Sequence, residues 1–211
     1  WDKFSKDLAI KLKPFLKKWK IRSHHDLACG TGVFVKEMSR LGINSSGLDV
    51  SKEMIKVAKL NYPHLKFEIG DMVNFKLNKP VDFITCNYDS INHLLIFKEW
   101  EKVFRNVFNN LKQNGKFLFD INTIRKINNI NDINYILFIK GDYILIKKAN
   151  RIRNNTCVFY IEWFQKIKNN LYKHYCEKNK EISFPYRKIK KSLKKMGFKD
   201  AKILFSENRN S

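Results

Sequence analysis

Polar residues follow four successive candidate strands, and a glycine turn follows the first. Asp26 leads into the turn at 28–32, and Asp49, Asp71 and Asn87 close the next three strands. The carboxyl ends of parallel strands meet at one sheet edge, where open α/β folds bind ligands. Glycines let the backbone approach a ligand closely, and the following helix start offers free N–H groups. Carboxylates at Asp49 and Asp71 are placed to accept ribose hydroxyls and an adenine amino group, so we predict a nucleoside-bearing ligand.

The glycine pattern disfavours a nicotinamide dinucleotide. Gly30 and Gly32 are present, but Val35 occupies the position of the third glycine of the dinucleotide fingerprint.

The elements that must position these residues alternate between strand and helix, as in a parallel sheet built from βαβ units. An opening helix has Phe4, Leu8 and Leu12 on one face, and we expect Pro14 to break or restart it. Predicted strands cover 25–28, a segment ending at 48–50, 65–69, 81–86 and 116–121. The helices between them cover 33–41, the segment from Ser51 to Pro63, and an amphipathic stretch from about Trp100 that Gly115 should close.

The pattern changes from about residue 122 to 183. Hairpin signals lie at Gly141-Asp142 and Asn169-Asn170, with strands at 135–140, 143–147, 157–164 and 171–176. A helix from Pro185 to Gly197 and a strand over 201–205 then restore the alternation. We predict a doubly wound, mostly parallel α/β domain from 1–121 and 184–211, with 122–183 as an antiparallel β insertion covering the substrate side.

These motifs, in this order, resemble class I S-adenosylmethionine-dependent methyltransferases of the small-molecule type. The matching segments are 26–32, 47–54, 70–72, 81–87 and 115–120, with a looser match at 196–198.

The resemblance implies S-adenosylmethionine as the cofactor and assigns residues to its parts. They are Asp26, Ala28, Gly30, Thr31 and Gly32 at the methionine part, Asp49 at the ribose, Val50 and Met54 along the adenine, Asp71 and Met72 at the adenine amino group, and Cys86 and Asn87 near the sulfonium.

Three features depart from the family. Ala28 stands for the first glycine, and His24 and His25 replace apolar residues of the first strand. We expect the family's last antiparallel strand and its upstream aromatic segment to lie beyond the ends of this chain.

No acid–base constellation stands out, and methyl transfer needs chiefly alignment and a dry site. His93 and His174 are weak candidates for a base, because a single histidine more often has a structural role than a catalytic one. Thr85-Cys86 matches the nucleophile dipeptide of RNA cytosine methyltransferases without the rest of that motif, and Asn87-Tyr88-Asp89-Ser90 lacks the prolines of the adenine enzymes. Neighbouring His24 and His25 point to opposite faces of a strand, so we expect no metal site.

Composition limits the partners. The net charge of +22 leaves an RNA partner as a less favoured alternative. Lys, Asn, Ile and Phe all have AT-rich codons and are abundant together, so genome composition accounts for the charge, and the lysines are scattered and do not form one basic stripe. The four cysteines are far apart and no long apolar run occurs, so we expect reduced thiols, a cytoplasmic protein and no membrane partner. The alternatives to a small-molecule N- or O-methyltransferase are an RNA methyltransferase and a non-catalytic S-adenosylmethionine-binding protein.

Overall fold

The computed structural model describes residues 2–130, 134–169 and 171–204. They form two compact units: Trp1–Ile84, Trp100–Phe117 and Pro185–Ser211 make the first, and Thr85–Glu99 with Leu118–Phe184 makes the second. Across the described ranges, none of the helices combines the length and the apolar character that crossing a membrane requires.

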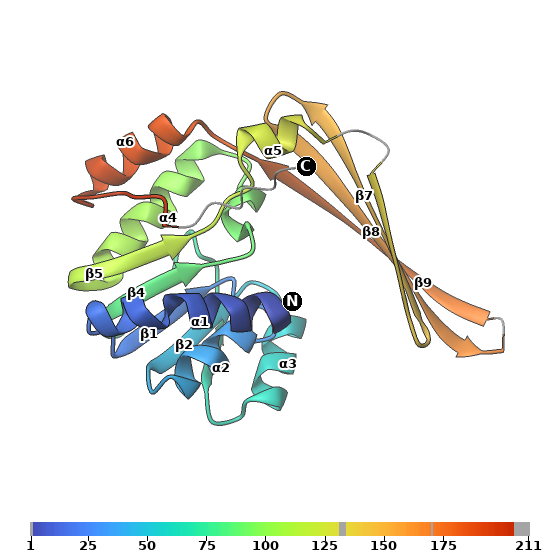
Figure 1. The fold of residues 1–211 in the computed structure, drawn as a ribbon, viewed down its shortest axis with the longest axis horizontal. Coiled ribbons are helices and arrows are strands. Elements are labelled where there is room, and N and C mark those ends of the chain that lie inside the picture. The colour runs from blue at the N-terminus through green and yellow to red at the C-terminus, as the bar shows by residue number, and fades with distance from the viewer. Residues whose placement is uncertain (1, 131–133, 170, 205–211) are drawn as a thin grey trace. The chain divides into compact units, whose positions relative to one another are not determined.

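A five-stranded parallel sheet organises the first unit (Figure 1). Its order is β3-β2-β1-β4-β5, with bounds β1 Ser23–Leu27, β2 Asn44–Asp49, β3 Lys66–Ile69, β4 Val81–Cys86 and β5 Leu111–Phe119. The register pairs Asp26 with Gly47 and Asp49 with Ile69. The ends of β1, β2 and β3 therefore lie along one edge, as the sequence predicted.

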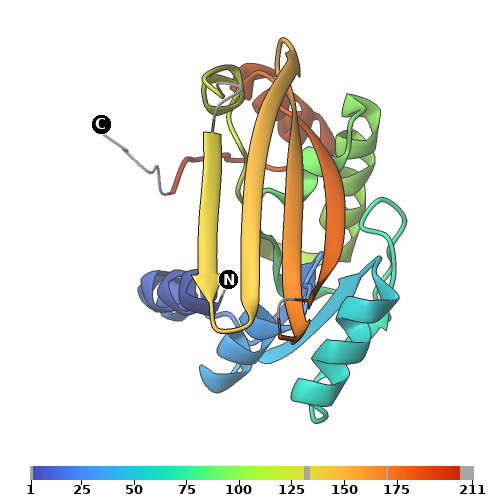
Figure 2. The ribbon, with the colours of Figure 1, turned by 90° about the vertical axis from the view of Figure 1, so that its right-hand side faces the viewer.

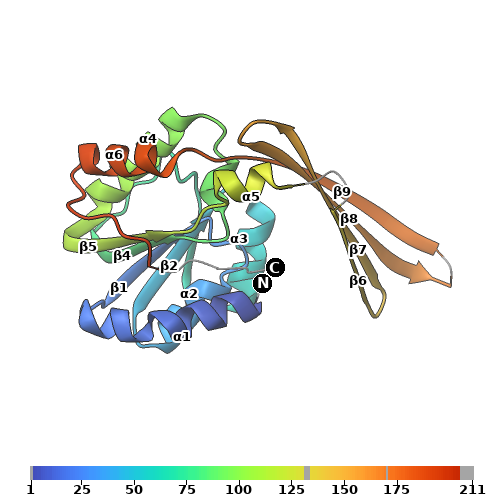
Figure 3. The same cartoon turned by 45° about the horizontal axis from the view of Figure 1, so that its top comes forward.

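Helices cover both faces of this sheet, with α1 and α2 on one side and α4 and α6 on the other (Figure 3). The bounds are α1 Asp2–Lys18, α2 Val33–Arg40, α3 Lys52–Asn61, α4 Phe97–Asn110 and α6 Tyr186–Met196. The Ser51 side chain caps α3 by accepting from the Met54 N–H at 3.2 Å. Gly197 ends α6 with φ 110°, and a Cβ there would lie 2.4 Å from the Phe108 ring.

An antiparallel sheet of order β6-β7-β8-β9 makes up most of the second unit (Figure 2). Its strands are β6 Asn134–Lys140, β7 Tyr143–Arg153, β8 Thr156–Lys168 and β9 Leu171–Ile182. A 3-10 turn, η1 Ser90–His93, and a short helix, α5 Ile124–Asn128, complete the unit. The predicted insertion is therefore antiparallel, with longer strands than expected. Asn170 of the second predicted turn lies outside the described residues.

Three predictions about the elements are wrong. Pro14 does not interrupt α1, because Leu12 and Leu16 on either side of it are buried and hold one continuous helix. Gly115 does not close α4, which ends at Asn110. The buried Asn110 side chain turns to backbone groups, accepting from Leu77 N–H at 2.7 Å and donating to the Asn106 carbonyl at 2.8 Å.

The third wrong prediction is the strand over 201–205. Residues 201–204 have no strand partner in the described part of the chain, and Ile203 is 67% exposed. Phe205 lies outside the described residues.

Candidate cofactor site

The glycine turn after β1 has a left-handed backbone at three alternate positions. The φ angles are 54° at Ala28, 54° at Gly30 and 80° at Gly32. A Cβ on Gly30 would meet nothing within 4 Å, so the turn borders open space, whereas one on Gly32 would lie 2.6 Å from the Phe67 ring. The second glycine is thus needed for packing and the first leaves room for a ligand. Thr31 between them is half-buried.

Asp49 joins this turn to the end of β2. One of its carboxylate oxygens accepts from Gly30 N–H at 2.8 Å, and the other accepts from Ser51 N–H at 2.9 Å. Each oxygen keeps a further lone pair for a ligand hydroxyl. The sequence placed Asp49 beside the turn, and the structure brings the two together.

The predicted adenine residues lie just beyond Asp49. Val50 is 74% exposed and Met54 is 45% exposed, so two apolar side chains next to a carboxylate face solvent. Asp71 is exposed, and its side chain accepts from Val73 N–H at 2.8 Å, while Met72 is half-buried. An apolar surface flanked by carboxylates has the chemistry that an adenosine requires.

Asp26 lies within β1, before the turn, and is not at the surface. It is 3% exposed, and its charge, with that of Asp49, adds to the effect of burial in raising the pKa of the Cys29 thiol. Cys29 is therefore a packing residue in its protonated form.

Cys86 ends β4, Asn87 follows it, and both are buried residues of the second unit. Two residues later, Asp89 enters a network that sequence reasoning missed, here called the carboxylate network: Asp89, Asp120, Asn122 and Glu181. The Asn122 side-chain nitrogen donates to Asp89 at 2.5 Å and to Glu181 at 2.6 Å. Asp89 N–H donates to the Asp120 carboxylate at 3.1 Å. Asp120 and Asn122 follow β5, so a search for polar residues after the fifth strand, as after the first four, would have found them. Nothing in the sequence marks Glu181 as a member of the network.

The two candidate bases have different surroundings. His93 offers a ring nitrogen that lies, with oxygens of Asp89 and Glu181, in a group whose atoms are all within 4.8 Å of one another. His174 is exposed, hydrogen-bonds Glu162 at 2.9 Å and stacks on Phe164 with centroids 4.6 Å apart. Because seven positions separate them on β9, His174 and Glu181 are on opposite faces of the sheet. The structure thus joins His93, and not His174, to the carboxylate network.

Comparison with known proteins identifies what this chain is similar to. Residues 25–115 match the methyltransferase domain family, and a crystal structure of an S-adenosylmethionine-dependent methyltransferase from Clostridium acetobutylicum superimposes with a TM-score of 0.80 at 25% identity, covering 89% of this chain and 78% of that one. The chain is thus similar to methyltransferase domains over residues 25–115 and has the fold of an S-adenosylmethionine-dependent methyltransferase. These similarities confirm the resemblance and the fold class predicted from the sequence.

Two relatives extend the comparison. An uncharacterized protein of Methanocaldococcus jannaschii is 29% identical over 178 residues, which are 82% of this chain and 60% of that protein. The chain therefore spans about 60% of the length of this relative. A dTDP-3-amino-3,6-dideoxy-alpha-D-glucopyranose N,N-dimethyltransferase of Streptomyces fradiae is 33% identical over 69 residues, which are 33% of this chain and 27% of that protein.

Proposed function

We propose that the protein transfers a methyl group from S-adenosylmethionine to an amine nitrogen of a small molecule. The observation that carries the proposal is the Asp49 carboxylate held against an open glycine turn at Gly30. The choice of nitrogen rests on the Streptomyces fradiae relative, which acts on an amino sugar nucleotide.

The residues at the end of β1 and β2 fit the cofactor. Gly30 and Thr31 would border the methionine part, Asp49 would accept the ribose hydroxyls, and Val50 with Met54 would cover the adenine. Asp71 and Met72 would face the adenine amino group, Asp26 and Ala28 would shape the turn, and Cys86 and Asn87 would line the reacting end. When bound, S-adenosylmethionine supplies an electrophilic methyl group, and the task of the protein is to hold the acceptor nitrogen in line with it and exclude water.

Thermal unfolding with S-adenosylhomocysteine tests the cofactor site. A ligand at 100 times its dissociation constant adds about 2.7 kcal/mol, which raises the midpoint of a domain of this size by roughly 5–11 °C. We expect this shift with S-adenosylhomocysteine and none with NAD. No shift with 1 mM S-adenosylhomocysteine would refute the proposed function.

The matched variants are Asp49→Ala and Glu68→Ala, the latter an exposed acid on β3. Hydrogen bonds to a charged group contribute about 1.5–3 kcal/mol, so Asp49→Ala should weaken S-adenosylhomocysteine binding about 10- to 150-fold and Glu68→Ala should leave it unchanged. Asp49→Asn, which keeps one acceptor oxygen, controls for a folding defect.

The acceptor class is tested with an amino sugar nucleotide, dTDP-3-amino-3,6-dideoxyglucose, and its 3-hydroxyl counterpart. Methylation of the amine alone supports the proposal. Methylation of the hydroxyl compound alone would show that the acceptor atom is oxygen and not nitrogen. Cofactor binding without methylation of any amine would indicate a non-catalytic binding protein.

A further inference from the structure

One side chain holds two carboxylates together in the second unit. The Asn122 amide nitrogen donates to Asp89 and Glu181, which come from the loop after β4 and from β9. Asn92 fixes Asn122 in turn, because its side-chain oxygen accepts from Asn122 N–H at 2.9 Å and its nitrogen donates to the Asn122 carbonyl at 3.1 Å. Asn92 and Asn122 are 0% and 4% exposed, so this arrangement is rigid.

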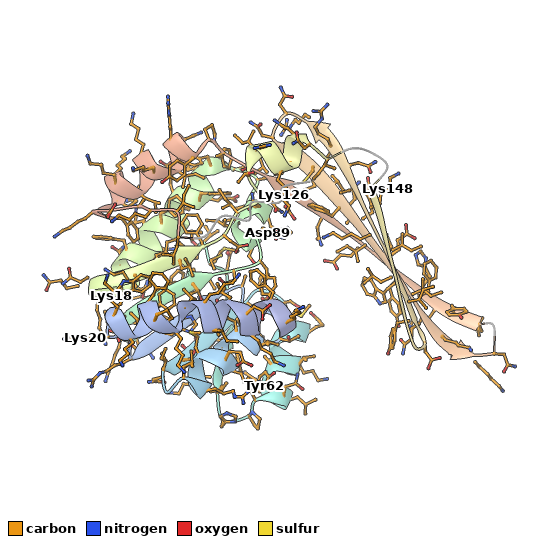
Figure 4. The ribbon with its side chains drawn as sticks, in the orientation of Figure 1. Lys18, Lys20, Tyr62, Asp89, Lys126 and Lys148 are labelled. Carbon is orange, nitrogen blue, oxygen red and sulfur yellow. The ribbon has the colours of Figure 1, made fainter. Side chains whose placement is uncertain are left out.

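The negative charge of Asp89 and Glu181 is not neutralised by a salt bridge in the part of the protein that the structure describes. None of the salt bridges of the described residues includes Asp89, Asp120 or Glu181. Burial raises the pKa of Asp89, and the charge of Lys126 on α5 opposes this shift in part (Figure 4). Burial, followed by the charge of Asp89, raises the pKa of Glu181 to about 7. A carboxylate of this kind gains and loses a proton near neutral pH.

An unsatisfied hydroxyl lies just past the end of β9, where Glu181 and Ser183 are buried and Ile182 between them is half-buried. Ser183 N–H donates to the Asn155 carbonyl at 2.9 Å beside the Thr156–Ile182 pair. Ser183 follows Glu181 by two positions, is 1% exposed, and its Oγ has no hydrogen-bond partner in the described part of the protein. A buried hydroxyl without a partner is costly, and it is satisfied when a ligand brings a polar group. The Cys157 thiol, opposite Glu181 on β8, is 0% exposed and has its pKa raised by burial and then by Glu181, so it adds no charge.

The hydrogen-bonding pattern favours an ammonium ligand over a metal ion. Asn122 presents a nitrogen donor, which is not a metal ligand, between the two carboxylate oxygens. An ammonium group instead adds N–H donors to the remaining lone pairs of Asp89, Glu181 and the Ser183 hydroxyl.

We infer that Asp89 and Glu181 receive the ammonium group of the methyl acceptor and that Glu181 is the base that deprotonates it. This inference rests on the proposed function. In this step an N–H bond of the ammonium breaks, its electron pair stays on nitrogen, and the proton forms an O–H bond with the Glu181 carboxylate. The nitrogen then carries the lone pair that methyl transfer requires.

Within the second unit, the network is joined to the end of β4. Asp120 N–H donates to the Cys86 carbonyl at 3.4 Å, and Asp89 is two residues past Asn87. Cys86 and Asn87 are the residues assigned to the reacting end of the cofactor. The titratable and charged groups around Glu181 are Asp89 and His93 after β4, Asp120 after β5, Lys126 on α5, Lys147 on β7 and Cys157 on β8.

The first test is an NMR titration of wild-type protein with ¹³C-labelled glutamate, assigned through Glu181→Gln. We expect Glu181 to titrate near pH 7, as its surroundings imply. The amino sugar nucleotide should lower the midpoint, because a bound cation favours the carboxylate, and the hydroxyl counterpart should not. A midpoint below 5, or an equal response to both compounds, would overturn the inference.

The second test compares Glu181→Gln with Glu177→Gln. Glu177 is on the same strand and face, is exposed and accepts from the Asn179 side chain at 2.8 Å, so it is a matched control. Glu181→Gln should lower kcat about 10²- to 10⁴-fold at pH 7, with the deficit shrinking above the pKa of the acceptor amine, while Glu177→Gln should change kcat less than twofold. An unchanged pH profile in Glu181→Gln would contradict the base role. Because both variants should bind S-adenosylhomocysteine like wild type, a failure of cofactor binding would count against the proposed function and not against this inference.

Discussion

His24 and His25 occupy the centre of β1, where most parallel strands are apolar. Their imidazoles face opposite sides: His24 packs against Phe34 and Phe83, and His25 stacks on Phe75. Each ring has one serine partner, Ser45 at 2.7 Å for His24 and Ser46 at 2.8 Å for His25. Burial lowers the pKa of His24 to about 3 and that of His25 to about 4, so both rings are neutral parts of the core.

This arrangement predicts a loss of stability in mild acid. The unfolded histidines have a pKa of about 6.5, so they bind protons below that pH while the folded ones do not. Stability is fully present above pH 6.5 and falls as the pH drops toward the folded values, by about 2 kcal/mol per histidine at pH 5. Urea unfolding between pH 7 and pH 5 measures this slope.

His25→Phe should reduce the stability lost between pH 7 and pH 5 by about 2 kcal/mol, whereas Glu181, with its raised pKa, contributes in the opposite direction and is unaffected. Ser46→Ala, which keeps the imidazole, should retain the slope while lowering stability at every pH. An identical slope in wild type and His25→Phe would show that other groups cause the acid sensitivity.

At the scale of elements, the contact between α2 and β2 explains how Val35 replaces the third glycine of a dinucleotide fold. Val35 is 0% exposed and belongs to a core cluster with Cys29, Ile55, Ala58 and Phe67. A Cβ on Gly47 of β2 would lie 2.7 Å from the Cys29 Cβ and 2.9 Å from a Val35 methyl group. The close approach of helix and strand is therefore provided by a glycine on the strand instead of on the helix.

Gly47→Ala should destabilise the first unit by about 1–3 kcal/mol, the usual cost of overpacking a filled core. Gly70→Ala is the control, because its nearest contact is Leu48 at 3.9 Å and its φ is not positive. Chemical denaturation of the two variants gives the comparison. Equal stabilities would mean that the α2–β2 contact can relax.

At the scale of the whole molecule, the net charge of +22 attracts any polyanion. Such binding is driven by counterion release and falls steeply with salt without regard to sequence. It does not by itself make RNA the methyl acceptor.

We predict that the protein binds single-stranded RNA homopolymers at low salt, loses most of that affinity between 50 and 200 mM salt, and incorporates no labelled methyl group into them. Filter binding and methyl-transfer assays on the same RNA measure both quantities. RNA methylation at physiological salt would move the assignment to an RNA methyltransferase.

The sequence by itself determined the parallel sheet and the strand-end residues to which the cofactor is assigned. The alternation of strands and helices, the turn at 28–32 and the acids at Asp49 and Asp71 are local signals, because parallel strands bring their carboxyl ends to one edge whatever the details of packing. Local signals also placed the Ser51 cap and the Gly197 stop. They were wrong at Pro14 and Gly115, where burial of Leu12 and Leu16 and the side-chain bonds of Asn110 outweighed the usual preferences of those residues.

Only the tertiary structure decided the carboxylate network. Asn122 and Glu181 are 59 positions apart, and nothing in their spacing predicts contact. Their hydrogen bond depends on the register of β8 and β9, which sets the face on which each side chain lies, and a slip of one residue would turn Glu181 away. Strand-end chemistry can be read from sequence because topology fixes it, whereas a contact between distant strands follows from the register of the folded sheet.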